Sequence, residues 1–176
     1  MDGLRRCEPR LGTGSEAGAV EGRPLDALRR YPALLVRAAE RLCAVPIAHV
    51  VEVMRALPIE PIAGAPSFVP GLAIIRGAPT PVVDLGLLTG SRSATGRWVT
   101  LRLGDRRAAL AVDAVIGVRA LDGWLLQDLP PLLRDAGAEV VEAIGVIDAE
   151  LLVSLRAGRL VPEDVWQALA AREAVP

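Results

Sequence analysis

Two stretches of the sequence, Ala33–Val53 and Trp98–Val118, align with each other without a gap. Five residues are identical between them, several others exchange one apolar residue for another, and an acid occupies each turn, Glu40 in the first and Asp105 in the second. Apolar runs separated by tight turns predict strand, turn, strand and further strand in each stretch. The chain is therefore predicted to contain a duplicated β unit. The identical pairs are Arg37 with Arg102, Arg41 with Arg106, Ala44 with Ala109, Val50 with Val115, and Val53 with Val118.

A second hairpin is predicted to complete each unit. Proline and glycine punctuate residues 58–71 and exclude a long helix there. The strands 71–76 and 80–84 follow, joined by a turn at 77–79, and 85–88 is predicted to form one helical turn. The run 81–85 has a weaker counterpart in 151–155. About five short strands in each unit predict a sheet that curls into a small barrel to cover its edges.

The polar loop 90–96 divides the predicted units. We expect a disordered tail over 1–31, which is rich in Gly, Arg and Glu, a first lobe over 32–90 and a second lobe over 97–160. Residues 162–171 are predicted to form a C-terminal helix, because an early proline precedes two acids and an apolar stripe.

The residue types exclude most catalytic chemistry. All 20 basic residues are arginine, so no lysine is available for a Walker phosphate loop or for a Schiff base. The single histidine, His49, and two distant cysteines, Cys7 and Cys43, do not match a zinc site, and no serine has the setting of a nucleophile elbow. We therefore predict that the chain is not an enzyme and needs no cofactor or metal.

Charge and hydropathy limit the compartment and the partners. Twenty basic residues against 21 acidic ones give a net charge of −1, which argues against nucleic acid as a partner. Apolar runs are short and no apolar leader opens the chain, so we predict a cytoplasmic protein that does not insert into a membrane.

The order of motifs resembles the CheW family of chemotaxis coupling proteins. The resemblance covers about 33–169 and is strongest in 71–77, with the sequence GLAIIRG, followed by 81–85, with the sequence PVVDL. Further matches are 44–47, 50–53, 65–71, 104–107, 111–115 and 151–153.

The resemblance implies an all-β fold of two tandem five-stranded SH3-like barrels around a shared apolar core, with a C-terminal helix. It implies an adaptor that couples the cytoplasmic tips of chemoreceptors to the regulatory domain of a CheA-like histidine kinase, recruited to receptor arrays at the inner face of the membrane. By position, the kinase contact falls on Ile75, Arg76, Gly77 and Pro79. The receptor groove falls on Ile47, Val50, Val51, Val53, Val112 and Val115.

Two alternatives remain open at the level of sequence. One is a β-barrel domain that binds or hydrolyses a small ligand, whose mark would be a deep polar cavity with converging acids. The other is a diverged CheW-like lattice protein of a pathway other than chemotaxis. The chain also departs from the family pattern, because Ile74 stands where the family often has asparagine before the Leu-Arg-Gly motif.

Overall fold

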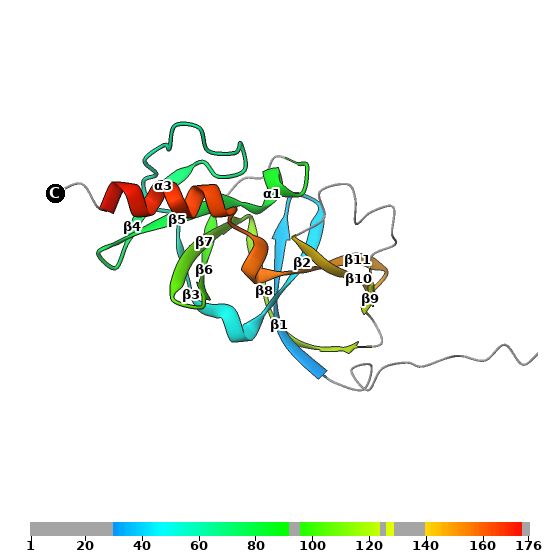
Figure 1. Cartoon of the computed structure of the whole chain (residues 1–176). Coiled ribbons are helices and arrows are strands. Elements are labelled where there is room, and N and C mark those ends of the chain that lie inside the picture. The colour runs from blue at the N-terminus through cyan, green and yellow to red at the C-terminus, as the bar shows by residue number, and fades with distance from the viewer. Residues whose placement is uncertain (1–29, 92–95, 124–125, 129–139, 174–176) are drawn as a thin grey trace, which may run out of the picture.

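The computed structural model describes residues 30–91, 96–123, 126–128 and 140–173 (Figure 1). The predicted mostly β fold is confirmed: two sheets form the body and a helix closes the described chain. One sheet has the order β8 (Ala114–Asp122), β1 (Arg30–Ala38), β2 (Arg41–Pro46), β11 (Glu150–Leu155), β10 (Val141–Ile147) and β9 (Leu126–Asp128). The other has the order β3 (Val50–Arg55), β6 (Arg97–Leu103), β7 (Arg106–Val112), β5 (Ala78–Asp84) and β4 (Gly71–Ile75).

Short helical elements connect and cover the sheets. They are the 3₁₀ turns η2 (Ile47–His49) and η4 (Ala157–Arg159), the single α-helical turn α1 (Leu85–Leu88) and the terminal helix α3 (Glu163–Glu173). Asp84 caps α1, because its Oδ1 accepts a hydrogen bond of 3.0 Å from the Leu87 amide. β1 begins at Arg30, so the last two residues of the expected tail belong to a strand. The rest of that tail lies outside the described residues.

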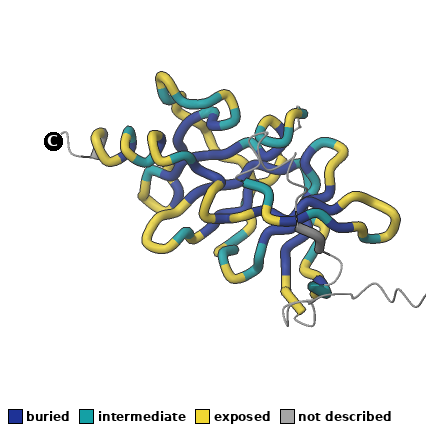
Figure 2. The backbone as a smooth tube through the Cα atoms, turned by 45° about the vertical axis from the view of Figure 1, so that its right-hand side comes forward, coloured by how far each residue is buried: buried dark blue, intermediate teal, exposed yellow. Residues whose placement is uncertain are grey.

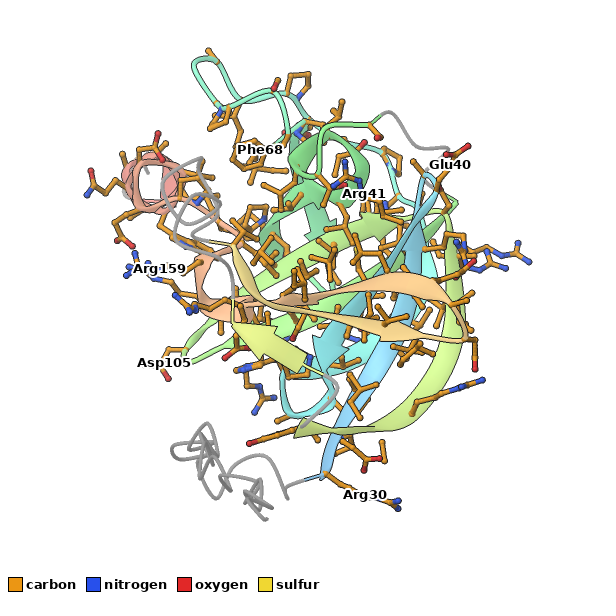
Figure 3. The ribbon with its side chains drawn as sticks, turned by 90° about the vertical axis from the view of Figure 1, so that its right-hand side faces the viewer. Arg30, Glu40, Arg41, Phe68, Asp105 and Arg159 are labelled. Atoms are coloured by element: carbon orange, nitrogen blue, oxygen red, sulfur yellow. The ribbon has the colours of Figure 1, made fainter. Side chains whose placement is uncertain are left out.

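The duplication is confirmed in the strand order and register of the sheets. When β9 is set aside, β8-β1-β2-β11-β10 in one sheet matches β3-β6-β7-β5-β4 in the other. Ala33 pairs with Pro46 between β1 and β2, and Trp98 pairs with Ala111 between β6 and β7, which is the same register at the equivalent positions of the second repeat. The two equivalent turns, labelled by Glu40 and Asp105, lie at opposite corners of the view in Figure 3.

The sheets do not follow the tandem division expected at the 90–96 loop. β1 and β2 pair with β8 and β11 from the second half of the chain, while β6 and β7 pair with β3 and β5 from the first half. Each repeat therefore gives its first hairpin to the other repeat's sheet. The short η2 turn after β2 carries the chain directly across to the second sheet, so β3 cannot continue in the sheet that holds β2.

The second hairpins of the two repeats correspond in a different alignment from the expected one. Ile75 pairs with Ala78 across the β4–β5 turn, and Ile147 pairs with Glu150 across the β10–β11 turn. Superimposing the two turns places Arg76 at the position of Asp148, and it places 81–85 on 153–157 instead of 151–155. The expected alignment was wrong by one full strand period, which preserves the apolar pattern and so escapes detection in the sequence.

Apolar residues on both faces of the central strands form three clusters. The shared core takes residues from both sheets, among them Leu34 and Val36 of β1 and the equivalent Val99 and Leu101 of β6. The opposite faces build a separate cluster in each sheet. Ala33, Leu35, Leu42, Ala44, Leu121 and Leu152 form the cluster of the six-stranded sheet. Ala73, Ile75, Val82, Trp98, Ala109 and Ala111 form that of the five-stranded sheet. Figure 2 shows the result, with buried strand centres and exposed hairpin ends.

Cys43 lies fully buried in the shared core, where burial raises the pKa of its thiol to about 11. Because the thiolate is the reactive form, we expect Cys43 to resist thiol reagents while the protein is folded. The measurement is the rate of reaction with Ellman's reagent in a Cys7→Ser variant, which leaves Cys43 as the single thiol, with and without urea. Rapid reaction of the folded variant would contradict this placement.

Asp113 lies between β7 and β8, where the chain passes from the five-stranded sheet to the six-stranded sheet. It forms hydrogen bonds to the β1–β2 turn. Its Oδ2 accepts a hydrogen bond of 2.6 Å from the amide of Ala39, which has φ +52°, and its own amide donates to the Arg37 carbonyl. Oδ1 is buried and has no hydrogen-bond partner among the described residues.

We expect Asp113→Ala to lower the free energy of unfolding by about 1–3 kcal/mol, because the Ala39 amide loses its acceptor. Asp113→Asn keeps an acceptor at this position and should retain most of the stability. Urea unfolding followed by circular dichroism measures both variants. Equal losses of unfolding free energy for the alanine and asparagine variants would contradict this explanation. They would show that the carboxylate charge stabilises the fold, and not the hydrogen bond accepted from the Ala39 amide.

Candidate functional site

The β4–β5 hairpin ends in the two-residue turn Arg76-Gly77. Both residues have positive φ, +51° and +79°, as a type I′ turn requires. Gly77 adopts this conformation without steric cost, and a side chain at Arg76 tolerates it less well. The turn therefore places an arginine at the exposed end of a rigid, twisted hairpin.

The Arg76 guanidinium is oriented by a bidentate ion pair. Its Nε and Nη2 donate to Oε1 and Oε2 of Glu52 on β3, at 2.8 and 2.6 Å. The side chain of Arg76 remains 69% exposed, against 26% for Glu52, so the pair is open to a partner on the arginine side. The hydrogen bond from Arg76 lowers the pKa of Glu52. Because β3 and β4 are the outer strands of their sheet, the pair also bridges its two edges.

The four residues predicted for the kinase contact have different positions. Arg76 and Gly77 are exposed at the turn and Pro79 is partly exposed. Ile75 is only 6% exposed and packs in the cluster of the five-stranded sheet, so it supports the hairpin from inside. Its neighbour Ile74, which pairs with Pro79 across the hairpin, is 58% exposed. The sequence did not indicate Ile74, because residues 72–75 are all apolar and their pattern does not show which of them faces solvent.

An apolar hollow of about 480 Å³ lies beside Ile74 and Pro79. The segment after β3, the strand β4 and the helix α3 supply its walls. The lining residues are Leu57, Pro58, Glu60, Leu72, Ala73, Ile74, Pro79 and Leu169. The backbone of Glu60 bridges to Leu72 at 2.7 and 2.8 Å and holds the outer wall in place. The hairpin thus combines a cation with an adjacent apolar depression.

The residues predicted for the receptor groove fall into three groups, which are exposed, partly buried and fully buried. Val51 and Val53 on β3 are 44% and 45% exposed. Ile47, Val50 and Val115 are partly buried against the shared core, and Val112 is fully buried within it. Val112 therefore supports the surface from beneath and is not accessible to a partner.

Val51 and Val53 face solvent because they alternate along β3 with the partly buried Val50, Glu52 and Met54. The register of β3 against β6 shifts between Val50 and Glu52, and that of β8 against β1 shifts at the equivalent point, Ile116. A bulge of this kind leaves one residue unpaired and bends the strand. The strand β8 likewise carries its own exposed pair, Ile116 and Val118, at 53% and 59%. The ungapped alignment of the two repeats is the sequence signal that relates these two pairs, and the predicted groove omitted Ile116 and Val118.

A second hollow, of about 770 Å³, lies where α3 meets the sheets. Its polar side contains Arg106, which forms a bidentate pair with Glu163 at 2.8 and 3.0 Å and lies 5.1 Å from the ring centre of Trp166. Glu163 is the one acid among its described lining residues. His49 also borders it, with Nδ1 3.1 Å from the Arg102 carbonyl. The converging acids that would mark a hydrolytic site are not found among the described residues of this hollow.

Within the described ranges, no group of His, Cys, Asp and Glu is arranged to hold a metal ion. The helices described there are also too short or too polar to cross a bilayer. The features that remain are surfaces: an arginine hairpin beside an apolar hollow, and exposed valines on an outer strand. Surfaces of this kind are typical of domains that bind other proteins.

The comparisons with known proteins agree with this class. The CheW-like domain matches residues 32–165, so this chain belongs to the CheW-like domain family. It is 25% identical over 139 residues to the chemotaxis protein CheW of Treponema pallidum (strain Nichols), covering 74% of this chain and 82% of the relative. The crystal structure of the scaffolding protein TtCheW from Thermoanaerobacter tengcongensis matches with a TM-score of 0.62 and 24% identity, covering 76% of this chain and 98% of that one. CheW-like domains are non-catalytic, in agreement with the prediction that the chain is not an enzyme.

Proposed function

We propose that this CheW-like protein is an adaptor that couples chemoreceptors to a CheA-like histidine kinase. The observation that carries the proposal is the Arg76-Gly77 turn, whose guanidinium is held in one orientation by Glu52 and remains exposed. A fixed arginine beside an apolar surface suits recognition of a folded protein, because the charge selects the partner and apolar burial supplies affinity. The relatives' names, a chemotaxis protein and a scaffolding protein, support the same role.

The kinase contact is proposed to use Arg76, Gly77 and Pro79, with Ile74 added as the accessible isoleucine. Ile75 holds the hairpin from inside the five-stranded sheet. A carboxylate or a backbone carbonyl of the kinase regulatory domain would meet the guanidinium, and an aliphatic side chain would enter the hollow beside Ile74. Since Glu52 already occupies one edge of the guanidinium, the partner binds its remaining exposed edge.

The receptor contact is proposed to use Val51 and Val53, flanked by Ile47, Val50 and Val115. Exposed β-branched residues on an outer strand offer an apolar strip, which fits the apolar face of an amphipathic helix. The cytoplasmic tip of a chemoreceptor presents such helices. The protein is accordingly proposed to act in the cytoplasm and to gather at receptor arrays on the inner face of the membrane.

The experiment that tests the proposal is a binding assay with the two partners from the same organism. Isothermal titration of the full chain with the regulatory domain of the kinase, and separately with a soluble receptor-tip fragment, should give two saturable interactions. A kinase assay with receptor-containing membranes should show receptor control of phosphorylation only when the chain is added. If the chain binds neither partner, or if receptor control of the kinase is the same without it, the adaptor role is wrong.

A further inference from the structure

The hollow of about 770 Å³ beside α3, called the α3 hollow from here on, has no part in the proposed kinase and receptor contacts. It lies at the edge of the shared core, where apolar residues from both halves of the chain remain only partly buried. A ligand with an apolar body would cover these residues and gain free energy from their burial. They are Phe68, Leu88, Leu103, Val140 and Trp166.

The charged residues of the α3 hollow favour an anion. Two arginines, Arg106 and Arg159, line it together with one acid, Glu163, among the residues that the structure describes. With His49 counted as neutral, two arginines against one glutamate leave one positive charge in excess. Arg159 lies on η4, beside the start of α3 (Figure 3).

Arg106 is held in a fixed orientation at the mouth of the α3 hollow. Its Nη1 and Nη2 donate to Glu163 at 2.8 and 3.0 Å, and its guanidinium lies 5.1 Å from the ring centre of Trp166. A guanidinium has five N–H donors, so Arg106 keeps donors that this pair does not use. A cation with free donors therefore lies directly beside an aromatic ring.

The two hollows of the molecule differ in the ligand that they suit. The hollow of about 480 Å³ beside Ile74 has aliphatic walls and one acid, Glu60, with no arginine among its described lining residues. The α3 hollow combines apolar and aromatic walls with cations. Pockets that enclose a small molecule have volumes of about 300–1,000 Å³ and join apolar walls to a few polar groups. The α3 hollow fits this description.

We propose that the α3 hollow binds a small organic carboxylate with an apolar body, such as an arylalkanoic acid or a medium-chain fatty acid. The carboxylate pairs with Arg159 and with the donors of Arg106 that Glu163 leaves unused, and the apolar body lies against Trp166 and Leu103. An inorganic anion fits less well, because it would leave the apolar walls in contact with water.

This inference does not rest on the adaptor role. The residues that line the α3 hollow are outside both proposed protein contacts. His49, which also lines it, is the last residue of η2 and directly precedes β3. A bound carboxylate therefore lies next to the base of the strand that carries Val51 and Val53, without covering them.

The test is a nuclear magnetic resonance titration of the ¹⁵N-labelled full chain with 4-phenylbutyrate, at low salt and in a buffer without carboxylate or phosphate. We expect saturable shifts with a dissociation constant of about 1 mM or lower, largest at the Trp166 indole N–H and at the amides of 158–166. Two control ligands separate charge from burial. The uncharged 4-phenylbutanol and the small anion acetate should each bind at least about tenfold more weakly.

A pair of variants tests the contribution of the excess cation. Arg159→Gln should weaken binding of 4-phenylbutyrate by at least about fivefold, because the carboxylate loses a charged partner. Arg156→Gln is the matched control and should bind like the wild type, because Arg156 is exposed in the same segment but does not line the hollow. Circular dichroism establishes that both variants are folded.

Three results would overturn the inference. They are the absence of saturable shifts up to about 10 mM ligand, shifts that lie away from the α3 hollow, and equal affinities of Arg159→Gln and the wild type. The titration uses the chain alone, without kinase or receptor. Its failure therefore leaves the adaptor role intact, and failure of the chain to bind a kinase or a receptor would leave the carboxylate site intact.

Discussion

Replacing Trp98 with alanine is expected to lower the free energy of unfolding by about 3–5 kcal/mol. Trp98 is 1% exposed and is the largest side chain in the cluster of the five-stranded sheet. Three of its neighbours there, Ala73, Ala109 and Ala111, are too short to move into the space that the indole leaves. The cost therefore includes an unfilled cavity as well as the lost burial.

Urea unfolding followed by circular dichroism measures this loss. Trp98→Phe keeps much of the apolar volume and should lose clearly less stability. Trp166→Ala on α3 is a second control, because that ring is only partly buried and lies against Arg106. A loss for Trp98→Ala no greater than that for Trp166→Ala would contradict the placement of Trp98 at the centre of this cluster.

The same tryptophan shows how far the sequence determines the fold. The duplication places Trp98 at the position of Ala33, and both lie in equivalent clusters, so the β content, the repeat and the register of its first hairpin were predictable from periodicity. The exchange of hairpins between the repeats was not predictable. A strand's residue pattern specifies which side chains are buried, but it does not specify which of two similar sheets the strand joins. That choice depends on the direction of the short turn η2 and on packing in the shared core.

The candidate site was predictable to a similar degree. A turn was expected at 77–79, one residue beyond the start of the observed turn Arg76-Gly77, because Arg76 was assigned to the preceding strand. Glu52 was not expected as the partner of Arg76, because the two are far apart in the sequence and the equivalent of Glu52 in the second repeat is Gly117. The assignment of Ile75 instead of Ile74 to the outer face has a physical cause. Both faces of β4 carry apolar residues, so the alternation of residue types along the strand does not show which face is buried and which faces solvent.

Reversing the charge at Arg76 is expected to weaken binding of the kinase regulatory domain by at least about tenfold, or about 1.4 kcal/mol. The variant Arg76→Glu removes the exposed cation and places a carboxylate next to Glu52, so both the partner contact and the internal pair are lost. Isothermal titration measures the affinity, and circular dichroism establishes that the hairpin's sheet is intact. Arg41→Glu, an exposed arginine at the start of β2, is the matched control and should bind like the wild type.

A second variant separates the two roles of the arginine. The double change Glu52→Arg with Arg76→Glu restores an internal ion pair between β3 and the hairpin but presents the opposite charge to a partner. If Arg76 contacts the kinase directly, this double variant remains as weak as Arg76→Glu, because the sign of the exposed charge is still reversed. If it recovers the wild-type affinity, the ion pair acts only by holding the hairpin, and the contact with the kinase lies elsewhere on this surface. The proposed direct contact therefore requires that the double variant is folded but binds the kinase no better than Arg76→Glu.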